Sequence, residues 1–89
     1  MNNLLTIVFS AYQSHKLLDK VIKQLPSNFK VLVIENSQDN NLKINLENKF
    51  KNVEVIIPKE NLGLAKSYNL AIKRSKTKYV FLNNPDLKI

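Results

Sequence analysis

The chain has 89 residues, of which 44% are hydrophobic and 24% charged, and its formal net charge is +7. This composition is ordinary for a folded domain and does not fit intrinsic disorder. The chain has no cysteine and one histidine, which excludes disulfides, thiolate nucleophiles and Cys- or His-rich metal sites. Any chemistry must therefore use oxygen ligands, amides and lysines.

The positive charge is spread along the chain, although residues 73–78 form a short basic cluster. A small basic domain for nucleic acid or anionic lipid is one interpretation. The aromatic residues that single-strand binders interleave with basic ones are missing, so we expect no nucleic-acid partner. The first apolar run, residues 4–9, is too short to span a bilayer and follows no Lys or Arg, so we predict no membrane span or signal peptide and a cytoplasmic location.

The first half of the chain predicts two strands and two helices. Residues 4–9 are apolar and partly β-branched, the pattern of a strand covered on both faces. Ser14 can cap a helix with apolar residues at helical spacing, which Pro26 ends. Residues 31–34 repeat the buried-strand pattern and lead into the polar tract 35–41. A weaker helix follows, and its apolar residues at four-residue spacing are Leu42, Leu46 and Phe50.

The second half predicts a third strand at residues 53–57, a third helix that begins at the only glycine, Gly63, and a fourth strand at residues 79–82. The apolar face of the third helix would consist of Leu64, Ala65, Tyr68, Ala71, Ile72 and Ser75. Helices between successive strands imply parallel pairing through right-handed crossovers. The predicted fold class is therefore α/β, a parallel β-α-β-α-β-α-β three-layer Rossmann-like sheet with all strand C-termini along one edge.

Ligands of open α/β sheets bind at the carboxyl ends of the strands. A single glycine excludes both glycine-rich phosphate cradles, the Rossmann fingerprint and the P-loop. Acidic residues remain at the strand tips: Glu35 and Asp39 after the second strand, and Asp86 after the fourth. Such a site would bind a diphosphate through Mg²⁺ or Mn²⁺, because these cations accept carboxylate and phosphate oxygens together.

Three motifs, in order and at the expected spacing, resemble family 2 glycosyltransferases. They are Ile34-Glu35-Asn36-Ser37, the segment 59–65 with Asn69 on the third helix, and the segment 79–86 with sequence YVFLNNPD. The likeness runs from Thr6 to Ile89 and is closest to the rhamnosyltransferase-like branch.

The resemblance implies a truncated GT-A fold, with residues 1–89 as a single incomplete domain, the donor-binding half. It implies that the protein binds a nucleoside-diphosphate sugar through a divalent cation and transfers the sugar to a glycan or lipid acceptor, in cell-wall or polysaccharide biosynthesis. The general base is expected beyond Ile89, so no catalytic residue is assigned within this chain. Whether the chain is active by itself is left open.

The resemblance also implies site residues. Ser10, Ala11 and Tyr12 would lie beside the nucleoside, Glu35 would contact the base or ribose, and Asp86 would bind the metal. Glu35 stands where the family more usually has Asp, and Asn84 stands where the first acid of the metal motif often lies, which lowers the ligand charge. Asn61 and Gly63 lie at the start of the third helix, where free N–H groups and the positive end of the helix dipole can face a phosphate.

Each of these residues also has a structural interpretation. Glu35 could be a solvated loop acid and Asp86 a turn residue after Pro85. Asn61 could cap the third helix, and Gly63 could serve only to start it. For the whole chain, the alternative is a noncatalytic nucleotide-binding or protein-interaction module, and the open edge of the sheet is a predicted site of self-association.

Overall fold

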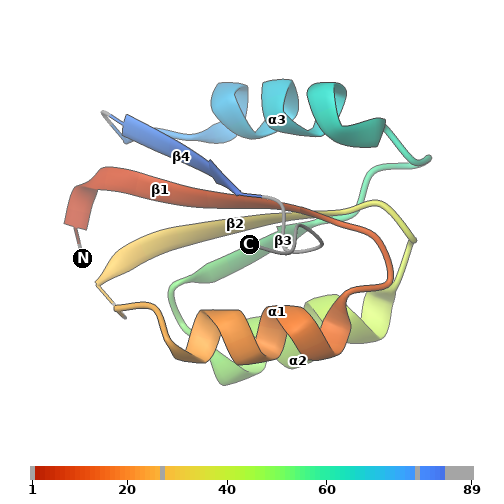
Figure 1. The fold of residues 1–89 in the computed structure, drawn as a ribbon, viewed down its shortest axis with the longest axis horizontal. Coiled ribbons are helices and arrows are strands. Elements are labelled where there is room, and N and C mark those ends of the chain that lie inside the picture. Colours follow the sequence, from red (N-terminus) through yellow and green to blue (C-terminus); the bar gives the residue numbers. More distant parts are fainter. Residues whose placement is uncertain (1, 27, 78, 84–89) are drawn as a thin grey trace.

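The computed structural model describes residues 2–26, 28–77 and 79–83. Strands and helices alternate along the chain, as the sequence predicts (Figure 1). Each element begins and ends within a few residues of its predicted place. The elements are β1 (Asn2–Ala11), α1 (His15–Lys23), β2 (Phe29–Glu35), α2 (Asn40–Lys49), β3 (Val53–Ile56), α3 (Gly63–Arg74) and β4 (Tyr79–Asn83).

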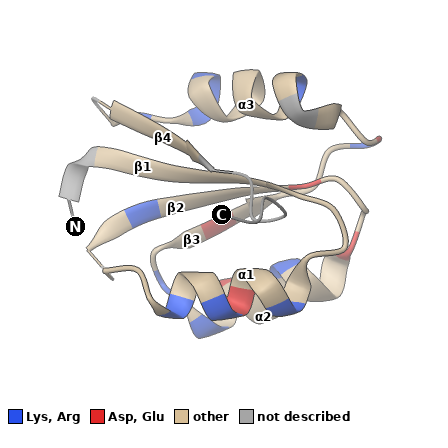
Figure 2. Ribbon diagram, viewed as in Figure 1, with Lys and Arg blue, Asp and Glu red and all other residues tan. Residues whose placement is uncertain are grey.

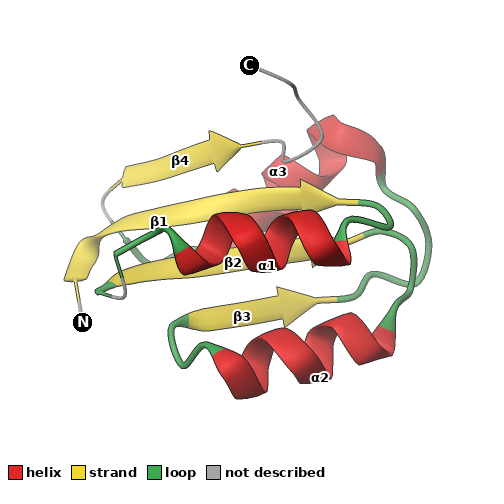
Figure 3. Ribbon diagram, turned by 60° about the horizontal axis from the view of Figure 1, so that its bottom comes forward, coloured by secondary structure: helices red, strands yellow, loops and turns green. Residues whose placement is uncertain are grey.

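The four strands form one parallel sheet in the order β3-β2-β1-β4. Helices α1 and α2 cover one face and α3 covers the other, which makes three layers (Figure 1). The predicted α/β class and parallel Rossmann-like arrangement are therefore confirmed. Because all strand arrows point the same way (Figure 3), the C-terminal ends lie along one edge of the sheet.

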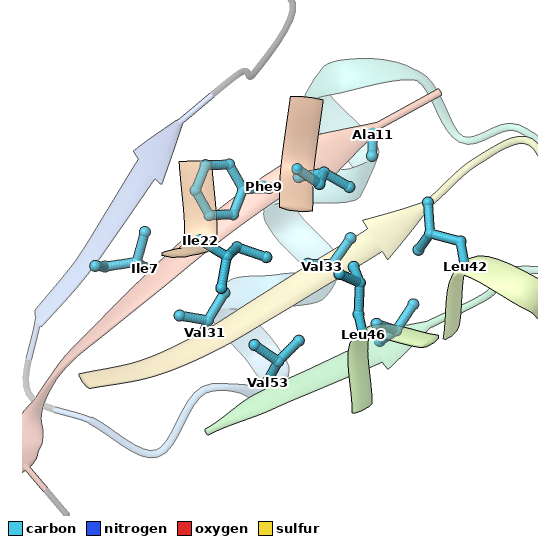
Figure 4. Packing of buried hydrophobic residues seen from close by; sticks show 11 residues of the cluster. Ile7, Phe9, Ala11, Ile22, Val31, Val33, Leu42, Leu46 and Val53 are labelled. Carbon is cyan, nitrogen blue, oxygen red and sulfur yellow. The ribbon is translucent and has the colours of Figure 1, made fainter. Parts of the chain in front are cut away.

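In the two central strands, residues 7–9 and 31–34 are continuous apolar runs because both faces of these strands are buried. In β1, Ile7, Phe9 and Ala11 point to the layer of α1 and α2, whereas Val8 belongs to a smaller cluster under α3 (Figure 4). The same alternation in β2 sends Val31 and Val33 to the first cluster. Parallel sheets covered on both faces require such continuous apolar runs.

The face that α3 turns to the sheet agrees with the predicted one in part, since Tyr68 and Ala71 pack against the sheet. Ala65 is exposed and Ile72 is 49% exposed, whereas Ser67 and Ala71 are fully buried. Apolar spacing alone placed Ala65 and Ile72 inward. The buried hydroxyl of Ser67 accepts a hydrogen bond from the Asn36 side chain on the sheet side, as described below, and this polar contact favours the observed rotation of the helix.

Ser14 precedes α1 as predicted, but its side chain does not cap the helix. The Ser14 hydroxyl instead donates to the carbonyl oxygen of Tyr12 at 3.0 Å. Gln13 between them has a φ of 52°, a left-handed conformation that folds the chain back tightly after β1. The Ser14 hydroxyl, which the sequence predicts as a helix cap, therefore stabilises the turn after β1 instead.

The edge strand β3 is protected by two side chains of α2. The Glu47 carboxylate accepts a hydrogen bond from Val55 N–H at 2.8 Å, and Lys43 Nζ donates to the Val55 carbonyl at 2.6 Å. Lys43 and Glu47 also form an ion pair at 2.9 Å. Since unpaired backbone groups on an edge strand invite another strand, this pair closes the middle of the β3 edge.

The contacts of Lys43 and Glu47 with Val55, called the clamp from here on, predict that the stability of the fold falls in acid. Burial acts to raise the pKa of Glu47, but the bonds from Val55 N–H and Lys43 outweigh it and hold that pKa below its ordinary value of 4.5. A depressed pKa stabilises the fold above the unfolded-state value, and this stability is lost as the pH falls through the folded-state pKa. Glu47→Gln should therefore lose less stability than the wild type between about pH 5 and pH 3, by up to about 1 kcal/mol because Glu47 is partly exposed.

Urea unfolding across this pH range measures the effect. Glu60→Gln is the matched control, because Glu60 is exposed and should leave the pH profile unchanged. Parallel profiles for the wild type and Glu47→Gln would show that the clamp does not depend on the charge of Glu47.

At the other edge of the sheet, β4 pairs with β1 on its inner side. Phe81 is 56% exposed and Leu82 is 40% exposed, although both lie in an apolar strand. Among the described residues no strand pairs with the outer edge of β4. No helix within the described ranges is long and apolar enough to cross a membrane.

Candidate functional site

The carboxyl ends of β1 and β2 lie side by side at the edge where the sequence predicts a ligand. Ser10 pairs with Ile34 and Ala11 with Glu35 in the parallel ladder, and Asn36 N–H continues it by donating to the Ala11 carbonyl at 2.8 Å. The structure therefore brings three of the predicted residues together: Ser10, Ala11 and Glu35.

The side chain of Asn36 joins three segments at this edge. Its Nδ2 donates to Ser10 Oγ at 3.3 Å and to Ser67 Oγ at 2.9 Å, and its Oδ1 accepts from Leu62 N–H at 3.0 Å. Asn36 is only 5% exposed, so these bonds are made in the interior, where lost partners are costly. Asn36 thus fixes the tip of β1, the tip of β2 and the first turn of α3 relative to one another.

Sequence reasoning gave Asn36 no role beyond its place in a motif. One signal was present: Asn36 directly follows an apolar strand, where a buried amide can reach neighbouring loops. Its partner Ser67 lies 31 residues away, and local pattern does not reveal such a pair.

Glu35 is fully buried, so the solvated interpretation of this residue is wrong. Its Oε2 accepts from the backbone N–H groups of Ser37 and Asp39, both at 2.9 Å, and its Oε1 accepts from the Ser37 hydroxyl at 2.7 Å. Bonds from N–H groups to a carboxylate are charge-assisted and stronger than neutral ones. Glu35 therefore builds the loop after β2, and its contact with a nucleoside stays a prediction.

Two further contacts tie the loops of this edge together. Ser37 Oγ accepts from Gln13 N–H at 3.1 Å, which links the loops after β1 and β2. Gln38, with a φ of 59°, donates through Nε2 to the Pro58 carbonyl at 2.5 Å, which links the loops after β2 and β3. The three loops thus form a connected surface.

Asn61 and Gly63 lie at the start of α3, as predicted. Asn61 Oδ1 accepts from Gly63 N–H at 2.9 Å, so Asn61 satisfies the first amide of the helix even though Leu62 occupies the cap position. Gly63 has a φ of +73°, and a Cβ there would meet no atom within 4 Å. The backbone conformation, and not crowding, therefore requires glycine at this position.

Tyr12 is 51% exposed next to these loops. It is the only predicted donor-binding aromatic residue, and its position leaves its ring accessible to a planar ligand. An aromatic ring can stack on any nucleobase, because every base has a planar π-face. The arrangement therefore combines one accessible aromatic side chain with loops fixed from below by Asn36 and Glu35.

The residues predicted for the metal motif, Asn84 and Asp86, lie outside the described residues. The two acidic residues of the loop after β2 have structural partners: Glu35 holds the loop, and Asp39 Oδ1 accepts from Leu42 N–H at 3.1 Å and caps α2. Within the described ranges, no three side chains of His, Asp or Glu form a group that could hold a metal ion. The assignment of Asp86 as a metal ligand therefore stays a prediction.

Comparison with known protein families identifies a family for nearly the whole chain. Residues 6–89 match the family described as Glycosyl transferase family 2. No curated protein matches the chain.

Proposed function

Because this chain belongs to glycosyl transferase family 2, we propose that it binds a nucleoside-diphosphate sugar at the carboxyl edge of its sheet. The family match carries the proposal, and the joined loops after β1, β2 and β3 support it. Residues 1–89 then form the donor-binding half of a domain, within the rhamnosyltransferase-like branch. The sugar passes to a glycan or lipid acceptor in cell-wall or polysaccharide biosynthesis.

The proposal gives each site residue at this edge a role. Tyr12 offers its exposed ring to the base, while Ser10 and Ala11 shape the floor beneath it. Glu35 reaches the base or ribose if the loop after β2 opens, since the closed loop buries its carboxylate. Asn61 and Gly63 lie at the start of α3, where the positive end of the helix dipole favours an anion.

The cation belongs to the proposal as a ligand of Asp86, with Asn84 as a neutral neighbour. A bound Mg²⁺ or Mn²⁺ supplies charge neutralisation for the diphosphate. The protein's own contribution at this edge is to bind and orient the donor.

Calorimetry with Mn²⁺ and UDP-, GDP- and dTDP-sugars tests donor binding. One donor should bind, and Asp86→Ala should weaken that binding by about tenfold or more, because a carboxylate ligand of the cation is lost. Asp19→Ala is the control, since Asp19 pairs with Lys49 on the helical layer at 2.7 Å. Absence of uptake for every donor would show the donor proposal to be wrong, and equal affinity in Asp86→Ala would refute Asp86 as the ligand of the cation.

We further propose that the chain self-associates through β4. The exposed side chains of Phe81 and Leu82 support this, as does the clamp of Lys43 and Glu47 on the opposite edge. Sedimentation velocity should show an associated species whose fraction rises with protein concentration. Phe81→Glu should abolish this species. Ile44→Glu, at an equally exposed position of α2, should leave association unchanged; a monomer at all concentrations would rule the proposal out.

A further inference from the structure

A second candidate site lies under the C-terminal end of α3, toward the amino ends of the strands and away from the loops that hold Asn36. It is a cavity of about 540 Å³ between α3 and the sheet, a volume within the range of about 300–1,000 Å³ of small-molecule sites. Thr6 and Leu32 from the sheet line it, and residues 73–77 close it from above. The cavity exists because one helix covers this face of the sheet, whereas two cover the other (Figure 1).

Hydroxyl groups hold one wall of the cavity in place. Ser75 Oγ donates to Thr6 Oγ1 at 3.1 Å, and Thr6 Oγ1 lies 2.7 Å from Thr77 Oγ1. Thr77 in turn donates to the Tyr79 carbonyl at 2.8 Å. Since each hydroxyl has one proton, these contacts form a directed chain from Ser75 through Thr6 to Thr77. This chain fixes the segment after α3 to the buried part of β1.

The charge around the cavity is strongly positive. Its cationic side chains come from β2, the last turn of α3 and the segment beyond, and Figure 2 shows these basic segments at the same end of the molecule. One carboxylate, Glu54, faces them; it contacts Lys30 at 3.7 Å and Arg74 at 2.9 Å. Lys73 and Lys76, both exposed, have no carboxylate of their own among the cavity-lining residues.

Helix electrostatics explain only part of this pattern. Basic residues in a last turn complement the negative end of a helix dipole, which accounts for Lys73 and Arg74. Lys30 lies on β2 and Lys76 follows the end of α3, so neither belongs to the last turn. Their convergence on one cavity with a single carboxylate indicates a site for an anion.

We propose that this cavity binds an organic phosphate. The phosphate group contacts Lys73 and Lys76 at the rim, and the attached carbon skeleton lies against Leu32 on the floor. A site of this type combines an apolar wall with a few converging charged groups. It is separate from the donor site, and its occupancy does not depend on the proposed function.

Phenyl phosphate, titrated into ¹⁵N-labelled protein without divalent cations, is the probe. Amide signals of Ser75, Lys76 and Thr77 should shift, while those of Ser37 and Gly63 at the opposite edge should not. Inorganic phosphate, which lacks the apolar part, should bind more weakly. Shifts confined to the opposite edge, or no shifts at all, would overturn the proposal.

A pair of charge-matched variants separates a site from general attraction to a basic protein. Lys73→Gln with Lys76→Gln should weaken phenyl phosphate binding by about tenfold. Lys16→Gln with Lys20→Gln removes the same charge from exposed positions of α1 and should change the affinity less than about twofold. Equal weakening of phenyl phosphate binding in both double variants would mean that the binding depends on net charge alone, and this would refute the site.

A lipid headgroup could supply the same phosphate chemistry. Phosphatidylglycerol vesicles, compared with phosphatidylcholine vesicles, distinguish this source. The protein is tested for co-sedimentation with phosphatidylglycerol vesicles. Binding that the Lys73 and Lys76 double variant loses, and that the Lys16 and Lys20 double variant keeps, would assign the site to a lipid phosphate. Phenyl phosphate binding without vesicle binding would assign it to a free phosphate ester, and vesicle binding equal in both double variants would count against the cavity.

Discussion

Replacing Asn36 by alanine is expected to lower the free energy of unfolding by about 2–4 kcal/mol. The substitution removes both donors to Ser10 and Ser67 and the acceptor for Leu62 N–H. Buried groups that lose their partner cost about 1–3 kcal/mol each, less where water can enter. Because small domains are stable by only about 5–15 kcal/mol, this single amide supports a substantial part of the fold.

Thermal or urea unfolding measures the effect of Asn36→Ala, and about 10–20 °C of lost melting temperature is expected for a domain of this size. Asn45→Ala is the matched control: Asn45 is exposed on α2, and its loss should change stability by less than about 0.5 kcal/mol. A variant at Asn36 as stable as the one at Asn45 would mean that the three segments hold together without this amide.

Replacing Glu35 by alanine should have a second large effect, a loss of about 2–4 kcal/mol. The N–H groups of Ser37 and Asp39 then lack their acceptor, and the Ser37 hydroxyl loses its contact. Glu35→Gln keeps one oxygen in place and should lose less, about 1–2 kcal/mol. Urea midpoints at constant slope give these differences, and Glu60→Ala, at an exposed residue, should be near neutral.

The two Glu35 variants also separate its loop role from its proposed nucleoside contact. If Glu35 acts only on the loop, Glu35→Gln should bind donor as the wild type does once both are fully folded. A loss of donor affinity in folded Glu35→Gln, of about tenfold, would support a direct contact with the base or ribose. If Glu35→Ala is as stable as the wild type, Glu35 does not stabilise the loop after β2.

The order and type of all seven elements could be predicted because they depend on local patterns. Continuous apolar runs such as residues 31–34 indicate strands buried on both faces, and the spacing of Leu42 and Leu46 indicates a helix. Parallel pairing then followed from the alternation of strands and helices. These features need no knowledge of distant partners.

Part of the inward face of α3 and the roles of Asn36 and Glu35 could not be predicted, since they depend on contacts between distant segments. The bond from Asn36 to Ser67 holds a polar position of α3 against the sheet, whereas apolar spacing favoured Ile72. Likewise, an acidic residue that directly follows a strand is predicted to be solvated or to bind a ligand. Only the fold of the loop, with the amides of Ser37 and Asp39 turned inward, shows that the Glu35 carboxylate has internal partners.

The clamp of Lys43 and Glu47 on β3 has a consequence for how copies of the chain can assemble. Two chains that join through their β4 strands would form one continuous sheet with a β3 strand at each end. Both ends would then carry the clamp, which disfavours the addition of a third copy and makes a twofold pair the expected assembly. Loss of the clamp would leave an unprotected β3 strand at each end, so alternating β4–β4 and β3–β3 contacts could extend the sheet into an open-ended assembly.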